Sequence, residues 1–264
     1  MKQTILRFLK KLPQPVKNMI HSTIGIIGKP EFNSDFRKFK AQKEQLSDTD
    51  FIFGRLYPCL SDKYLNSDSI RVDYFHQDLL VARRIYENNP QKHVDIGSRV
   101  DGFVAHVASF REIIVIDIRP PSGQVHNIKF VQRDFMSEME NDMIDYCDSL
   151  SSLHAIEHFG LGRYGDTVDF QGHIIGINNL YKMLKKGGKL YFSVPIGTPQ
   201  RIEFNAHRIF SPKYLVKQFE GKYNFDMFSY VDTNGDLHEN IDIKSFKNTY
   251  SDNYGCGIFE MTKL

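Results

Sequence analysis

The sequence has no tryptophan and only three cysteines, Cys59, Cys147 and Cys256, none of which is in a CxxC pair. An odd number of separated cysteines argues against a disulfide scaffold and against a cysteine-rich zinc module, so a reducing, cytoplasmic location is expected. Long hydrophobic runs are also absent. The longest, at residues 113–118, is interrupted by Asp117 and is far shorter than the roughly 18 apolar residues of a transmembrane helix.

No charge of one sign dominates, because 34 Lys and Arg residues stand against 32 Asp and Glu residues, a formal net charge of +2. This balance leaves no electrostatic footprint for nucleic acid, and we expect no nucleic-acid partner. The charge is nevertheless uneven along the chain. Residues 1–30 carry cations only, and the first acidic residue is Glu31.

The basic N-terminal segment allows two interpretations. Its apolar residues are interrupted by Lys10, Lys11 and Pro13, which excludes the h-region of a secretory signal. It is either a solvated arm or a helix in weak contact with a partner or with the inner face of the membrane. In the second case the contact would use Ile5, Leu6, Phe8, Leu9 and Leu12. Together with a turn-rich, irregular cover from residue 31, this segment makes up residues 1–70.

Residues 71–264 alternate helix-like and strand-like patterns. Helices are expected at about 73–88, 101–110 and 171–185, strands at about 93–97, 113–117, 128–131, 148–153 and 190–194, and a closing hairpin from 225–231 and 257–261. Strands that are apolar on both faces and alternate with helices indicate a parallel sheet covered on both sides. The predicted fold is a doubly wound, Rossmann-like α/β domain with a mostly parallel seven-stranded sheet, preceded by an irregular or helical extension.

Two acidic positions in this pattern indicate a nucleoside site. Asp95 and Gly97 lie at the end of the first strand, and Asp117 ends the second. A glycine there lets backbone approach a ligand, and a carboxylate at the tip of the second strand can accept both ribose hydroxyls. Arg99 stands where a dinucleotide site has its second glycine, and Phe103 and Val104 replace the Lys and Ser/Thr of a P-loop. S-adenosylmethionine (SAM), which has no phosphate, fits better than NAD or a nucleotide.

The motif order resembles that of the class I SAM-dependent methyltransferases. The shared elements are Asp95-x-Gly97, Asp117, Asp134-Phe135 after the third strand, the stretch Leu153-His154-Ala155-Ile156-Glu157-His158 after the fourth, and residues 184–190 before the fifth. Shorter strings, at residues 95–99, 201–208 and 254–260, resemble an uncharacterised methyltransferase-like family, a domain of unknown function found among surface-polysaccharide genes. Arg99 and Asp101 depart from the usual glycine-rich loop.

This resemblance implies a set of cofactor-binding residues. Gly97 and Ser98 would line the SAM site, Asp117 would bind the ribose, and Asp134 with Phe135 would flank the adenine. Asp95, Arg99 and Ile118 lie beside these positions, and His76 lies on the helix that often covers the cofactor in such enzymes. The expected cofactor-binding set is therefore His76, Asp95, Gly97, Ser98, Arg99, Asp117, Ile118, Asp134 and Phe135.

The stretch from His154 to His158 reads H-x-x-E-H, which is also an inverted zinc-protease motif. A position after a short strand of a parallel sheet argues against a protease. The resemblance implies instead that some O-methyltransferases bind a divalent ion (Mg, Mn or Zn) with this stretch and a later histidine, here Glu157, His158 and His207. Two other interpretations remain: a metal-free general base, or a structural helix start paired with arginine. The candidate catalytic residues are His154, Glu157, His158 and His207.

The site layout and the resemblance together predict a SAM-dependent O-methyltransferase in the cytoplasm. The resemblance to the family found among surface-polysaccharide genes implies that it acts on a small molecule, a sugar or surface-glycan precursor. The alternative is a catalytically silent, methyltransferase-like module that binds a partner in surface-polysaccharide assembly. The departures at Arg99 and Asp101 motivate this alternative. Oligomeric state is left open.

Overall fold

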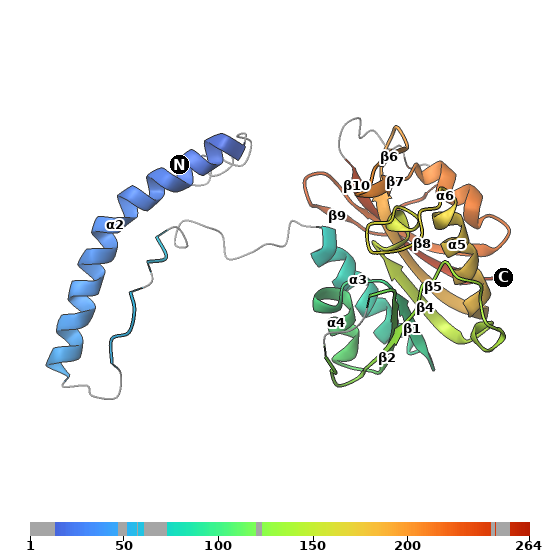
Figure 1. Cartoon of the computed structure of the whole chain (residues 1–264), viewed down its shortest axis with the longest axis horizontal. Helices are drawn as coiled ribbons and strands as arrows, with labels where there is room; N and C mark the ends of the chain where they lie inside the picture. Colours follow the sequence, from blue (N-terminus) through green and yellow to red (C-terminus); the bar gives the residue numbers. More distant parts are fainter. Residues whose placement is uncertain are drawn as a thin grey trace. The chain divides into compact units, whose positions relative to one another are not determined.

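The computed structural model describes residues 14–46, 52–56, 58–60, 73–119, 123–243, 246 and 254–264. The chain divides into two compact units, Met1–Asp68 and Ser69–Leu264 (Figure 1). None of the helices in the described ranges has the length and hydropathy needed to cross a bilayer. The apolar set at residues 5–12, on which a membrane-surface helix would depend, lies outside the described residues.

The described part of the first unit is dominated by one long helix, α2 (Gln14–Gln45), with Pro30 inside it. The expectation of an irregular cover from residue 31 is wrong for residues 31–45. The turn-forming residues at positions 33–35 are outweighed by good helix formers that follow them, because helix propensity sums over a window. Arg37 also donates to the Asn33 carbonyl oxygen at 3.3 Å, and Lys40 pairs with Glu44 one turn later.

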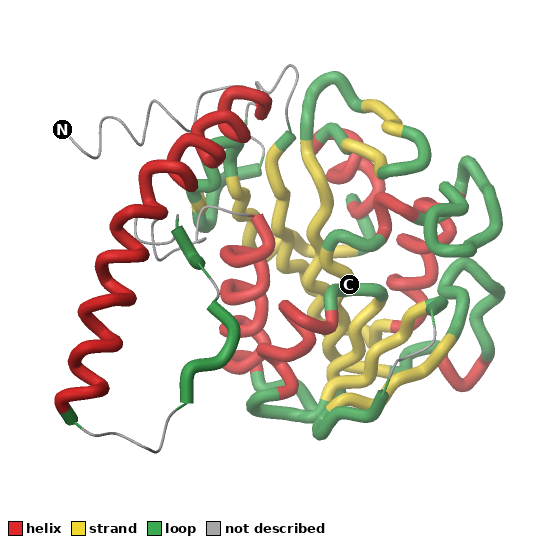
Figure 2. Tube along the Cα trace, turned by 60° about the vertical axis from the view of Figure 1, so that its left-hand side comes forward, coloured by secondary structure: helices red, strands yellow, loops and turns green. Residues whose placement is uncertain are grey.

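The second unit is built on an eight-stranded sheet in the order β3-β2-β1-β4-β5-β10-β8-β9 (Figures 1 and 2). The five strands from β3 to β5 are parallel, and β10 is antiparallel to both β5 and β8. The strands are β1 (His93–Ile96), β2 (Ile113–Asp117), β3 (Ile128–Gln132), β4 (Cys147–Leu153), β5 (Leu184–Ile196), β8 (Tyr223–Val231), β9 (Leu237–His238) and β10 (Gly255–Lys263). A separate hairpin pairs β6 (Arg201–Glu203) with β7 (His207–Ile209). This confirms the doubly wound α/β fold and the closing hairpin, and adds the short edge strand β9.

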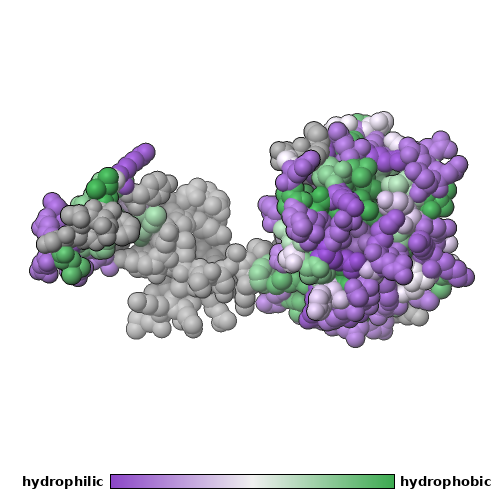
Figure 3. Space-filling model, turned by 90° about the horizontal axis from the view of Figure 1, so that it is seen from below, coloured by the Kyte–Doolittle hydropathy of each residue, from purple (hydrophilic) through white to green (hydrophobic). Residues whose placement is uncertain are grey.

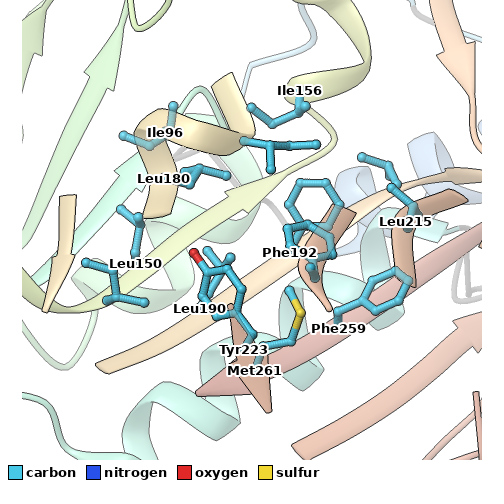
Figure 4. Close-up of a cluster of buried hydrophobic side chains, with 14 of the residues drawn as sticks. Ile96, Leu150, Ile156, Leu180, Leu190, Phe192, Leu215, Tyr223, Phe259 and Met261 are labelled. Atoms are coloured by element: carbon cyan, nitrogen blue, oxygen red, sulfur yellow. The ribbon is translucent and has the colours of Figure 1, made fainter. Parts of the chain in front are cut away.

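Helices cover both faces of the sheet. The helical elements are α3 (Asp73–Asn88), the π-helical turn η2 (Val100–Val104), α4 (Ala105–Ala108), the 3-10 turns η3 (Asn141–Met143) and η4 (Ile156–His158), α5 (Gly172–Met183) and α6 (Pro212–Phe219). One buried cluster joins α3, η2 and α4 to the sheet, and a second joins α5 and α6 to it. The second cluster contains Ile96, Ile156 and Leu180 (Figure 4), so the core fixes η4, the turn after β4, against α5.

Two helix boundaries differ from the prediction. The helix expected at 101–110 is a π-helical turn followed by the four residues of α4, because Gly102 has a non-helical backbone (φ −124°, ψ −105°). The helix expected to reach residue 185 ends at Met183, since Leu184 already pairs with Cys147 in the sheet. Neither change moves a strand end that borders the site.

Candidate active site

A pocket of about 180 Å³ opens at the carboxyl ends of the parallel strands. Strand β1 lies between β2 and β4 in the sheet. From β1 the chain continues through β2 and β3 toward one edge and then returns to β4 and β5 on the other side, so the connections separate beside β1 and leave a crevice. The pocket is lined by residues at the ends of four strands. They are Gly97 after β1, Asp117 at the end of β2, Asp134 after β3, and His154 and His158 in the turn after β4.

Gly97 is the first residue of the turn after β1 and lines the pocket. Its φ of +71° lies in the left-handed region, and a Cβ atom there would lie 3.1 Å from the Ala155 Cβ atom. Asp95 and Ser98 support this turn and do not line the pocket. The carboxylate of Asp95 is fully buried and accepts hydrogen bonds from the Ser98 amide at 3.0 Å, the Ser98 hydroxyl at 2.6 Å and the Ser151 hydroxyl at 2.5 Å. Burial raises the pKa of Asp95 to about 6 in spite of these donors.

Asp117 reaches the pocket from the tip of β2, and its carboxylate is already engaged. The Arg119 guanidinium donates to Oδ1 at 3.0 Å and to Oδ2 at 2.7 Å, and the Arg119 amide donates to Oδ1 at 2.8 Å. The same guanidinium lies 4.5 Å from the ring centroid of Tyr164. Ribose hydroxyls would therefore compete with Arg119 for the Asp117 carboxylate.

The pocket wall beyond Asp117 is apolar. Ile118 and Phe135 line it, as do Ile96 and Ile116 from the strands. Asp134, which precedes Phe135, accepts a hydrogen bond from the Met136 amide at 2.8 Å through Oδ1. A flat aromatic base fits between apolar side chains of this kind.

The tyrosine Tyr74, at the start of α3, covers the other side of the pocket. Its ring lies 5.0 Å from that of His154, and the Arg99 guanidinium lies 4.9 Å from its centroid. His76, expected in this place, does not line the pocket, and its ring contacts the neighbouring Phe75. The two positions differ by two residues, which on a helix is about 200° of rotation and therefore the opposite side. Tyr74 was not predicted; it lies three residues before Gln77 on the same face of α3, and Gln77 bonds His154, which lines the pocket.

His154 has a left-handed backbone (φ 51°) and is held from behind. Its Nδ1 lies 2.6 Å from Gln77 Oε1, an acceptor that also receives the Ser193 hydroxyl proton. The amide oxygen accepts only, so Nδ1 carries the proton and Nε2 keeps its lone pair. Burial, together with the nearby His158 and His207, lowers the pKa of His154 to about 3, and the imidazole is neutral at neutral pH.

His158 has the same tautomer for a similar reason. Its Nδ1 donates to the Ala206 carbonyl oxygen at 2.7 Å, so Nε2 is free to accept a proton. Burial lowers the pKa of His158 to about 4, and the Ala206 carbonyl opposes this shift. Glu157 Oε1 lies 3.7 Å from His158 Nε2, the side chain of Glu157 is 1% exposed, and its Oε2 has no hydrogen-bond partner in the described part of the chain. Burial raises the pKa of Glu157 to about 8.

The expected metal site is not formed by these side chains as they are arranged. His207 does not line the pocket; its ring lies 6.4 Å from that of His158, at 78°, and packs at 5.1 Å against Tyr254. Its Nε2 is 3.4 Å from Glu203. Among the described residues no group of three or more His, Cys, Asp or Glu side chains is placed to hold a metal ion. His207 has the sequence position expected for a metal ligand, but the β6–β7 hairpin directs its ring toward Glu203 of the same hairpin.

A glycine-rich loop at residues 160–166 lies beside the histidines. The Asp166 carboxylate organises it by accepting the amides of Gly160 at 2.8 Å and Gly162 at 3.2 Å. This places the Tyr164 ring 5.3 Å from that of His158, and the Arg163 guanidinium lies 5.0 Å from the centroid of the Tyr164 ring. The loop therefore forms a wall of the pocket that connects the histidines to Arg119.

A family model described as "Caenorhabditis protein of unknown function, DUF268" matches residues 123–255, about half of the chain. The chain belongs to this family. The match covers β3 to the start of β10, and so includes Asp134, the histidine-bearing turn and the β6–β7 hairpin of this DUF268 member. No curated protein matches the sequence.

Solved structures resemble this DUF268 member in fold. The [4+2]-cyclase SpnF has a TM-score of 0.53 at 13% identity, with 75% of this chain and 85% of that chain covered. The YcgJ protein from Bacillus subtilis has a TM-score of 0.50 at 13% identity, covering 71% and 98%. N-methyltransferase NodS from Bradyrhizobium japonicum WM9, in complex with S-adenosylhomocysteine, has a TM-score of 0.49 at 14% identity, covering 75% and 93%. The fold is the class I SAM-dependent methyltransferase fold, as the strand order also shows. Identities this low establish the fold alone, and a structure named as a cyclase shows that the fold does not decide the reaction.

Proposed function

We propose that this protein is a SAM-dependent methyltransferase that methylates a hydroxyl oxygen of a sugar or related surface-glycan precursor in the cytoplasm. The observation that carries the proposal is the pairing of two features in one pocket. One side has the acidic and apolar residues that suit a nucleoside, Asp117 and Phe135, and the other has two neutral imidazoles with free Nε2 atoms, His154 and His158. The glycan acceptor follows from the family resemblance of the sequence.

The residues present fit SAM. Gly97 lines the pocket at a position where an added Cβ atom would come within 3.1 Å of the Ala155 Cβ atom. Asp117 lies where ribose hydroxyls are accepted once Arg119 moves. When bound, SAM supplies an electrophilic methyl group. The protein's own task is then to orient the acceptor hydroxyl and to remove its proton as the oxygen attacks.

His158 is the proposed general base. Its Nε2 has a lone pair at neutral pH, and the Ala206 carbonyl fixes the ring and stabilises the imidazolium that forms. The one proton that leaves the acceptor hydroxyl stays on His158 Nε2, which lies 3.7 Å from Glu157 Oε1, and the buried Glu157 carboxyl keeps its own proton. His154, bonded to Gln77, supplies a second acceptor that orients the hydroxyl.

Two measurements test this proposal in sequence. Calorimetric titration with SAM and S-adenosylhomocysteine should show binding in the micromolar to low-millimolar range; no binding would overturn it. Transfer of labelled methyl from SAM to nucleotide sugars should then be lost in His158→Gln, while SAM binding is kept. His126→Gln is the matched control, because His126 is exposed and remote from the pocket lining. Equal methyl transfer by both variants would show that His158 is not the general base.

The second candidate, a silent binding module, is favoured by one specific observation. The Asp117 carboxylate is held by Arg119 at both oxygens, and Arg99 is paired with Asp101 in the loop where glycines are usual. Such a module would give no SAM binding in the titration above. The accompanying proposal, that the basic arm contacts a membrane surface or partner, predicts less association with anionic vesicles when residues 1–30 are deleted, and unchanged association excludes it.

A further inference from the structure

A second cavity, of about 250 Å³, lies beside the β6–β7 hairpin and shares no lining residue with the SAM pocket. Its walls come from the start of α5, the hairpin and the start of α6. Gln171 contributes from the N-cap of α5 and His173 from its first turn, Arg208 from β7, and Tyr214 from α6. None of the side chains that line this cavity is used in the proposed methyl transfer.

Arg208 is the unusual residue of this cavity. It is 3% exposed, and its guanidinium donates only to backbone carbonyls: Nη1 to Glu157 at 3.3 Å and to Phe159 at 2.5 Å, and Nη2 to Phe170 at 3.4 Å. Its Nε has no hydrogen-bond partner within the described ranges, and no ion pair joins Arg208 to a carboxylate there. A buried guanidinium without a counter-ion is costly, and an anionic ligand would offset that cost.

Asp166 and Asp169 lie near enough to favour the charged form of Arg208 electrostatically, but no carboxylate in the described ranges bonds its guanidinium. Asp169 Oδ1 accepts the Gln171 amide at 2.8 Å, Asp166 is bonded to the amides of its own loop, and Glu203 is paired with Arg201 at 3.0 Å. None of the described residues that line the cavity is acidic. The amino-terminal end of α5 also borders it, and a helix N-terminus favours negative charge. The electrostatic character of the cavity is therefore cationic.

The floor of the cavity is aromatic. The rings of Phe210 and Tyr214 stack at 18° with centroids 6.1 Å apart, and His173 lies 5.8 Å from Phe210 and donates to or accepts from the Tyr214 hydroxyl at 2.8 Å. His173 Nδ1 has no hydrogen-bond partner among the described side chains and backbone. At the rim, Phe170 is 70% exposed and Ile202 43% exposed. Aromatic faces and a few polar groups are what a ring-shaped ligand requires.

We propose that this cavity binds a sugar ring that carries an oxyanion, either the carboxylate of a uronic acid or a phosphate ester. The oxyanion pairs with the Arg208 guanidinium, the apolar face of the ring packs on Tyr214, which itself stacks on Phe210, and the hydroxyl groups bond the Gln171 and Gln200 amides. Binding needs no SAM and no methyl transfer, so it goes beyond the proposed function and is tested separately. Because Arg208 also holds the carbonyls of Glu157 and Phe159, an occupant would reinforce the turn that carries His158.

The test is a ligand-observed NMR titration of the full chain, without SAM, using glucuronate, glucose 6-phosphate and glucose. One or both acidic sugars should bind at least about tenfold more tightly than glucose, the effect of one charge-assisted hydrogen bond. The stronger of the two identifies the oxyanion as carboxylate or phosphate. Equal binding of all three sugars, or none up to about 10 mM, would overturn the proposal.

Two variants localise the binding. Arg208→Gln should reduce the affinity for the acidic sugars to that for glucose. Because this variant can lose stability, Ile202→Trp provides an independent test: the exposed rim residue is enlarged to fill the entrance, the fold is kept, and binding should again be lost. Val125→Trp is its matched control, an exposed apolar residue outside both cavities. Acidic-sugar binding that survives Ile202→Trp, or that S-adenosylhomocysteine displaces, would contradict this location.

Discussion

Arg119 holds both carboxylate oxygens of Asp117, at 2.7 and 3.0 Å, from a position only two residues further along the chain. Asp117 is the residue that the class I fold places at the tip of β2, where a ribose would bind. The pocket therefore contains its own competitor for the carboxylate. The Arg119 side chain is 52% exposed, so it has solvent to move into, and Tyr164 stabilises its present position.

Replacing this competitor should strengthen cofactor binding. In Arg119→Met the Asp117 carboxylate is free, and we expect SAM affinity to rise roughly two- to fivefold, the range for breaking a half-exposed ion pair. Calorimetric titration measures the change, with Lys129→Met as a control because Lys129 pairs with Glu112 away from the pocket. A loss of affinity in Arg119→Met would mean that the arginine itself contacts the cofactor.

The two pocket histidines should make folding stability depend on acidity. The pKa values of His154 and His158 are lowered by burial to about 3 and about 4, below the 6.5 of an unfolded chain. The unfolded state therefore binds more protons between these limits. The stabilising contribution is complete above pH 6.5 and is lost as the pH falls, by about 2 kcal/mol per imidazole at pH 5.

Urea unfolding of the protein at pH 5 and pH 7.5 measures this loss. His158→Asn should remove part of the pH dependence, while His126→Asn, an exposed histidine, should keep all of it. If His158→Asn loses as much stability at pH 5 as the parent protein does, then His158 is not a buried neutral imidazole.

Glu157 should act in the opposite direction at higher pH. Burial raises its pKa from 4.5 to about 8, so the native state holds a proton that the unfolded state has released. Its stabilising contribution is complete below pH 4.5 and is lost as the pH rises through 8, at about 1.4 kcal/mol per pH unit. Between pH 6.5 and 8 the free energy of unfolding of the parent protein should therefore fall relative to that of Glu157→Gln, because the histidines titrate alike in both proteins. An unchanged slope in the variant would assign the decline to another group.

Gly97 should tolerate no side chain. Its left-handed backbone and the 3.1 Å approach to Ala155 make Gly97→Ala unfavourable by about 1–2 kcal/mol, and SAM binding should weaken with it. Gly123→Ala, where nothing lies within 4 Å of the added Cβ, is the control and should behave as the parent protein does. Thermal unfolding and SAM titration of both variants check the prediction; a Gly97→Ala protein with parent stability would show that the turn relaxes without strain.

The site could be located from the sequence because its main positions are tied to strand ends. Asp117, Asp134 and Phe135 come directly after apolar runs, and parallel strands bring their carboxyl ends to one edge. His154 and His158 follow the same rule after β4. Asp95 has the right place in sequence but lies one layer deeper, where its role is to hold the Gly97 turn.

Contacts that depend on where a helix or a hairpin directs a side chain could not be predicted from the positions of strand ends. The family resemblance groups His207 with His158, yet the β6–β7 hairpin turns His207 toward Glu203 and Tyr254. Tyr74 took the place expected for His76 because helical rotation separates the two. The helix at residues 31–45 formed where turn residues had suggested an irregular cover.

By itself, then, the sequence determined the α/β class, the order of strands and helices, and the strand ends at which a nucleoside site would lie, since these depend on periodicity and on the chain's own order. Only the tertiary structure decided that Arg119 covers Asp117, that both pocket imidazoles are neutral with free Nε2 atoms, and that Arg208 lies buried beside an aromatic cavity. Those facts depend on which distant segments meet and on how deeply they are buried. No local pattern encodes the loss of water that shifts a pKa or leaves a guanidinium without a counter-ion.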